Sequence, residues 1–143
     1  MSETIAIAAD HGGFDLKSLL ILELRALGYD VLDLGTMNRD SVDYPDFAAM
    51  LAGAIGDGRA ARGVLVCGTG IGMSIAANRH RGIRAALVHD VTSARLARQH
   101  NDANVLVLGG RVIGPEVAKD CAKTFFTTEF EGGRHARRVA KMP

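Results

Sequence analysis

Three glycines follow a cysteine at the end of an apolar run, in the segment Cys67-Gly68-Thr69-Gly70-Ile71-Gly72. Because glycines leave backbone N–H groups unhindered, such a loop can hold an oxyanion or a phosphate. Cys67 directly precedes the loop, and the positive end of the helix that follows favours its thiolate form. The segment predicts an anion site with Cys67 as base or nucleophile. The alternatives are a tight strand-to-helix turn and a small buried cysteine, and Cys121, inside a helical apolar pattern, is interpreted as core.

Two histidines stand beside polar residues that could share in such chemistry. His11 follows Asp10, and His100 precedes Asn101. Each imidazole can transfer a proton near neutral pH, although a helix cap or a solvated side chain is the alternative. We expect both histidines on segments that emerge at the same edge of the fold as Cys67.

Arginines near the carboxyl end could supply a clamp for a phosphate. Arg134 and Arg138 are four residues apart, hence on one face of a helix, and two forked guanidiniums suit a phosphate. A solvated basic face or a short nucleic-acid patch is the alternative. The net charge is only +1, and no aromatic residues interleave with the arginines, so no nucleic-acid partner is expected.

Motifs for metals and cofactors are not found in the sequence. The spacings H-x-x-x-H and H-E-x-x-H do not occur, and two cysteines give no closed zinc site, so no metal is predicted. The first strand is not followed by G-x-G-x-x-G, and there is no Walker A pattern. We therefore predict no cofactor.

Apolar runs typical of strands alternate with helical patterns along the whole chain. Strands are predicted at 4–8, 30–34, 63–66, 83–88 and 105–108, and helices at 14–27, 46–55 with Pro45 as first residue, from the glycine loop to 78, at 92–100, 115–126 and 133–141. Strands that are continuously apolar indicate a parallel sheet covered on both faces. The prediction is α/β: a doubly wound, Rossmann-like αβα sandwich with five parallel strands.

The chain length and cysteine content bound the domain number and the location. With 143 residues and 48% hydrophobic residues, residues 1–143 are predicted to form one domain with its own core. Two cysteines do not make a disulfide scaffold, and neither a signal peptide nor an apolar run of about 20 residues is visible. We expect a cytoplasmic protein without a membrane role.

In doubly wound sheets, ligands bind beyond the carboxyl ends of the strands, where this sequence places its most polar and glycine-rich segments. Several of these segments together resemble ribose-5-phosphate isomerase type B. They are Ala9-Asp10-His11-Gly12-Gly13-Phe14, Asp43-Tyr44-Pro45, the stretch from Cys67 to Asn78, the stretch from Arg98 to Leu106, and Glu131-Gly132-Gly133-Arg134-His135. The resemblance extends from the first strand to the last helix.

The resemblance implies a metal-free aldose–ketose isomerase that works through a cis-enediolate, with Cys67 as the base. His100 takes the place of the ring-opening acid, with Asp10 and Thr69 as candidates to assist it. The substrate contacts that it implies are Asp10, His11, Gly68, Thr69, Gly70, Ile71, Gly72, Asn101, Arg111, Arg134 and Arg138. The glycine loop would hold the enediolate oxygen, Asn101 the sugar hydroxyls, and the arginines with His11 the phosphate.

The resemblance also implies a homodimer or a dimer of dimers with shared active sites, in which the C-terminal helix contacts the partner. Ribose 5-phosphate is the expected substrate. The same chemistry on allose 6-phosphate, galactose 6-phosphate or a tetrulose 4-phosphate is the alternative. A non-catalytic sugar-phosphate sensor and a nucleotide-dependent oxidoreductase are further hypotheses, but a sensor would lose Cys67 or His100, and both are present.

Overall fold

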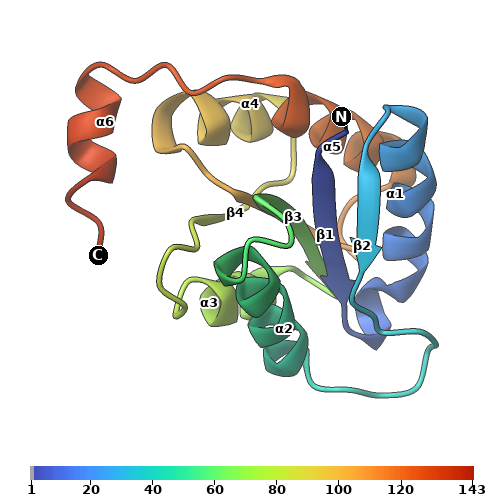
Figure 1. Cartoon of the computed structure of the whole chain (residues 1–143). Helices are drawn as coiled ribbons and strands as arrows, with labels where there is room; N and C mark the ends of the chain where they lie inside the picture. The colour runs from blue at the N-terminus through green and yellow to red at the C-terminus, as the bar shows by residue number, and fades with distance from the viewer. Residues whose placement is uncertain (1) are drawn as a thin grey trace.

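The apolar runs form the strands of a parallel sheet in the computed structural model, which describes residues 2–143 (Figure 1). Within these residues the strands are β1 (Thr4–Ala9), β2 (Asp30–Asp33), β3 (Arg62–Cys67), β4 (Ala85–Leu87) and β5 (Val105–Gly109). Their order across the sheet is β2-β1-β3-β5-β4, and every pair is parallel. The fully buried runs, Ile5 to Ala9, Val64 to Val66 and Val105 to Leu108, belong to the three inner strands β1, β3 and β5, as continuous apolar sequence predicts.

Helices cover both faces of the sheet, as the sequence predicts. The helices α1 (Phe14–Ala26), α4 (Val91–Asn101) and α5 (Pro115–Thr127) pack on one face, and α2 (Tyr44–Gly56) and α3 (Ile71–Ala77) on the other. The sixth, α6 (Arg134–Val139), contacts α4 and lies outside the sandwich (Figure 1). None of the helices within residues 2–143 combines the length and hydropathy that a bilayer crossing requires.

Most predicted elements are confirmed to within two residues, and β4 is the main difference. Its prediction began at Ile83, but the strand begins at Ala85. The side-chain oxygen of Asn104 accepts the N–H of Arg84 at 2.8 Å and takes the place of a strand partner there. A short 3-10 helix, η1 (His11–Gly13), was not predicted, and the Asp10 side chain caps it by accepting the N–H groups of Gly12 and Gly13.

The strand order reverses between β1 and β3, which sit side by side at the centre of the sheet. The chain leaves β1 through α1 on one face, and leaves β3 through α3 on the other. The loops after these two strands therefore part, and this switch point at the carboxyl edge is where open α/β sheets bind their ligands. The segments that follow Ala9 and Cys67 lie there.

A buried ion pair supports the neighbouring loop. Lys17 of α1 is only 2% exposed, and its Nζ donates to both carboxylate oxygens of Asp33 at 2.8 and 2.9 Å. The same carboxylate accepts the N–H of Gly35 at 3.0 Å, and Gly35 in turn accepts the N–H of Ala9 at 2.7 Å. The pair thus ties α1 and the end of β2 to the last residue of β1.

Replacing Lys17 by methionine is expected to lower the free energy of unfolding by about 1–3 kcal/mol. The loss is smaller than for a fully buried pair because Asp33 is 28% exposed, so water partly solvates its unpaired charge. Urea denaturation of the native protein and of the variant measures this change in unfolding free energy. Lys119→Met, which removes an exposed partner of Glu116, is the control and should change stability by under about 0.5 kcal/mol. Equal effects of the two substitutions would contradict a structural role for the Lys17 pair.

Candidate active site

The glycine loop after β3 folds back over the thiol of Cys67. The N–H of Gly70 donates to Cys67 Sγ at 3.1 Å, and the thiol side chain is buried at the end of the strand. Gly70 has a φ of +81°, and a Cβ there would lie 2.5 Å from Leu87, so only glycine fits this turn. The backbone N–H of Gly70 is therefore directed at Sγ, the atom that would act as base in this position.

The loop after β1 lies directly against the glycine loop. A Cβ built on Gly12 would be 3.1 Å from the backbone nitrogen of Gly68 and 3.3 Å from the Asp10 carboxylate. The Asp10 side chain is 7% exposed and is held by its bonds to η1. Asp10, His11 and the Cys67 loop thus share one corner of this edge of the sheet.

His11 also connects this corner to the polar loop that precedes α2. Its Nδ1 accepts the N–H of Val42 at 3.2 Å, so Nε2 is the ring nitrogen that this bond does not use. Across the loop, Thr69 is exposed, and its hydroxyl oxygen accepts the N–H of Ile71 at 3.2 Å. Gly72 packs directly against Tyr44 of α2: a Cβ built on Gly72 would lie 2.6 Å from the phenol ring.

Arg111 provides the positive charge at this end of the sheet. Its backbone N–H donates to the carbonyl of Gly68 at 2.9 Å, and its guanidinium lies beside the same residue, with Nη1 3.3 Å from where a Cβ would be. The side chain is exposed, so it can turn toward a bound anion. Cys67, the glycine loop, Asp10, His11 and Arg111 therefore form one cluster, which we call the thiol cluster.

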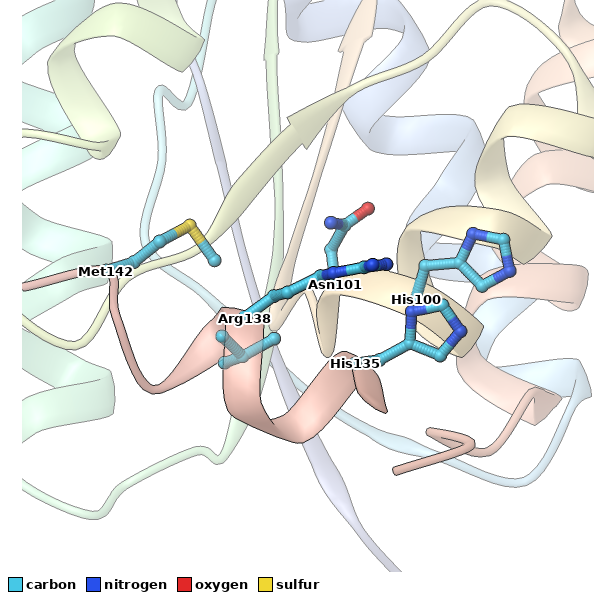
Figure 2. Close-up of a pocket in the computed structure, with 6 residues that line it drawn as sticks. His100, Asn101, His135, Arg138 and Met142 are labelled. Atoms are coloured by element: carbon cyan, nitrogen blue, oxygen red, sulfur yellow. The ribbon is translucent and has the colours of Figure 1, made fainter. Parts of the chain in front are cut away.

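The second set of predicted residues gathers elsewhere, between α4 and α6. His100, Asn101 and Arg138 line a cavity of about 320 Å³ with His135, Val139 and Met142 (Figure 2). The rings of His100 and His135 stack with their centroids 4.3 Å apart. We call this set the histidine cluster; the exposed Arg134 begins α6 beside it.

The position of His100 corrects the expectation that it emerges at the same edge as Cys67. Helix α4 ends at Asn101, four residues before β5 begins, so His100 lies at the amino end of that strand. Cys67 is paired with Gly109, at the carboxyl end of the same strand. The five residues of β5 place these ends roughly 13 Å apart, since a strand rises about 3.3 Å per residue. Within one chain, the thiol and histidine clusters are separate.

A buried arginine holds the end of α4 that carries His100. Arg98 Nη1 donates to the Asp102 carboxylate at 2.9 Å and to the carbonyl of Ala103 at 2.7 Å. Asp102 adopts a left-handed conformation with φ of 46°, and its carbonyl also accepts from Arg84 Nε at 2.9 Å. These bonds end the helix and fix the direction in which His100 and Asn101 leave it.

His135 and Glu131 are site residues to which sequence reasoning gave no role. Burial, and next the adjoining His100 ring and Arg134, lower the pKa of His135 below its usual value. Glu131 Oε1 lies 3.6 Å from His135 Nε2. Because His100 is more than 30 positions from both in the sequence, no local spacing could have revealed the cluster.

The fold and the thiol cluster define an α/β protein whose polar and glycine-rich loops gather at the switch point of a parallel sheet. The Ribose/Galactose Isomerase family profile matches residues 5–142. The chain is 46% identical to ribose-5-phosphate isomerase B of Escherichia coli over 94% of this chain and 91% of that protein, and 48% identical to D-erythrulose-4-phosphate isomerase of Pectobacterium atrosepticum over 97% and 92%. The chain belongs to the Ribose/Galactose Isomerase family of sugar phosphate isomerases, as the resemblance predicted.

Solved structures agree with this assignment. The crystal structure of a ribose 5-phosphate isomerase from Thermotoga maritima superimposes with a TM-score of 0.96 at 52% identity, covering 99% of this chain and 98% of that one. Identity at this level along the full length means that the sheet order and the loops at its carboxyl edge are shared, not only the general architecture. The αβα sandwich predicted from the sequence is therefore confirmed.

Proposed function

We propose that the chain interconverts ribose 5-phosphate and ribulose 5-phosphate, with Cys67 as the base. The observation that carries this proposal is the hydrogen bond from the Gly70 N–H to Cys67 Sγ. It fixes the sulfur beneath the glycine loop, and the Arg111 guanidinium lies beside that loop. A base, donors for a developing oxyanion and a cation for the phosphate then lie together at one edge of the sheet.

The proton moves along the carbon chain of the open sugar. The Cys67 thiolate removes the proton from C2, the C2–H electron pair forms a C1=C2 bond, and the O1 carbonyl becomes an oxyanion. Backbone N–H groups of the glycine loop stabilise that oxyanion. The protonated thiol then returns the proton to C1 as the O2 hydroxyl loses its own and becomes the ketone. One proton thus moves from O2 to the O1 oxyanion, so atoms and charge balance, and no oxidant is needed.

The histidine cluster is proposed to act on the same substrate from a second copy of the chain. Proton transfer needs contacts of about 3 Å, and the two clusters lie at opposite ends of β5, so one chain does not bring both of them to the reacting end of one sugar. In a two-fold dimer, His100 and Asn101 of one copy can face Cys67 of the other. His100 then protonates the ring oxygen, Asn101 holds sugar hydroxyls, and Arg134 and Arg138 join Arg111 and His11 at the phosphate. The position of α6 outside the sandwich supports this proposal, because the helix packs on α4 rather than on the sheet (Figure 1).

Other sugar phosphates are the alternative substrates, because Pectobacterium atrosepticum D-erythrulose-4-phosphate isomerase is as similar to this chain as the relatives named for ribose 5-phosphate. Sugars of four to six carbons share the reacting end and differ in the distance from that end to the phosphate. The span between the glycine loop and the arginines in the dimer would therefore select among them.

The test is to compare kcat/KM for ribose 5-phosphate, allose 6-phosphate, galactose 6-phosphate and erythrulose 4-phosphate, in buffer containing EDTA. We expect ribose 5-phosphate to be preferred. Preference for another sugar would keep the chemistry and replace the substrate. Binding of these sugar phosphates without turnover of any would contradict the proposal and favour a sensor.

A further inference from the structure

The histidine cluster brings together three donors that bind transition metals. His100, Glu131 and His135 each offer one ligand atom, and among residues 2–143 these atoms lie within 4.8 Å of one another. Two ligands about 2.1 Å from a tetrahedral zinc ion are roughly 3.4 Å apart. The 3.6 Å between Glu131 Oε1 and His135 Nε2 is close to that separation.

A second observation points to a ligand at the same place. His135 is 7% exposed, and its Nε2 is buried without a hydrogen-bond partner among the described residues. The 3.6 Å to Glu131 is too long for a hydrogen bond. Buried polar atoms are nearly always satisfied, so this nitrogen is free to accept a bond from a group that the chain itself does not provide.

The charges around the histidine cluster bear on its affinity for a cation. Glu131 supplies a negative charge, and it is about half exposed and can move toward the ion. Arg138 lines the same cavity and opposes a cation, which favours moderate rather than very tight binding (Figure 2).

We propose that His100, Glu131 and His135 bind one zinc-class divalent ion, with water in the fourth position. Two imidazoles and a carboxylate form a ligand set that suits this class of ion rather than magnesium or calcium. The rings of His100 and His135 are within 12° of parallel, so His100 must rotate out of the stack to direct a nitrogen at the ion. His100 is half-buried at the end of α4 and lines the cavity between α4 and α6.

Metal binding at this site would inhibit the isomerase, a consequence that rests on the proposed function. A His100 nitrogen bonded to zinc cannot carry the proton needed for ring opening. The reaction that we propose for Cys67 uses no metal, so the ion acts as a reversible inhibitor and not as a cofactor. Zinc binding is measured without turnover, so the test of the metal site does not depend on which sugar phosphate is the substrate.

The experiment is isothermal titration of the full-length, EDTA-stripped protein with zinc chloride in buffer without phosphate or sugar. We expect one equivalent per chain. His135→Asn and the isosteric Glu131→Gln should each weaken zinc binding by at least roughly tenfold. Replacing a residue that only supports a metal ligand already lowers metal affinity by about that factor, and these two residues are ligands themselves. Circular dichroism establishes that both variants are folded, and Glu131→Gln alters a half-exposed side chain without disturbing packing.

Two controls make the outcome specific. His80→Asn removes a histidine outside the cluster and should leave zinc binding unchanged. Cys67→Ser tests another side chain that can bind zinc and should also retain one bound zinc per chain. The proposal is overturned if the native chain binds no zinc, if His135→Asn and Glu131→Gln bind it as the native chain does, or if Cys67→Ser abolishes binding.

Discussion

Replacing Cys67 by alanine is expected to lower kcat for ribose 5-phosphate by at least about 10²–10⁴-fold, the contribution of a positioned general base. The methyl group cannot accept the C2 proton, and no other ionisable side chain occupies the place of Sγ beneath Gly70. Binding of the sugar phosphate should persist, because the backbone donors and Arg111 stay in position. Steady-state kinetics and calorimetric titration of the substrate measure the two effects separately.

The matched control is Cys121→Ala. Cys121 is fully buried in α5, and burial, with the nearby Asp90 and Asp120, raises its pKa to about 11, so it stays a neutral thiol near pH 7. Its removal should cost stability and leave kcat unchanged. If Cys67→Ala turned over substrate at the native rate, Cys67 would not be the base.

Combining two inactive variants in one heterodimer is expected to restore activity. Cys67→Ala damages the thiol cluster and His100→Ala the histidine cluster, and each dimer of one variant has two defective sites. When the two are co-expressed with different tags and the heterodimer is purified, one site receives the intact Cys67 and the intact His100. Activity should then reach about half of the native value, because a two-fold dimer has two equivalent sites.

The control pair is Cys67→Ala with Cys67→Ser, which damages the same cluster twice. Heterodimers of this pair should stay inactive, because neither site contains a cysteine. Should the Cys67→Ala and His100→Ala heterodimer also be inactive, both clusters would have to act within one chain. That result would contradict the shared site and the second copy that it requires.

Local sequence was sufficient to predict the sheet and the glycine loop that follows Cys67. The apolar runs of β1 and β3 predict buried parallel strands because both of their faces are covered, so no polar alternation is needed. Cys67 and its glycines are consecutive, and the strand-to-loop boundary that positions them is a local property. The resemblance predicted a chemical role for these residues, and the match to the family confirms the class of enzyme.

Contacts between distant segments were not predictable in the same way. The sequence pattern predicts Lys17 as an exposed polar residue of an amphipathic helix. The residue is buried because the carboxylate of Asp33, 16 residues later, neutralises its charge. His135 and Glu131 acquire their position only when α6 packs on α4. Neither periodicity nor spacing carries that information, since both describe neighbours along one element.

The sequence by itself determined the fold class, the strands and the loop that surrounds Cys67, because each depends on residues within one turn or one strand of one another. Only the tertiary structure decided that His100 lies at the opposite end of β5 from Cys67. The physical reason is the direction of a crossover helix: α4 returns the chain to the amino ends of the strands before β5 begins. Residues at the two ends of such a helix therefore belong to different edges of the sheet, however similar their chemistry.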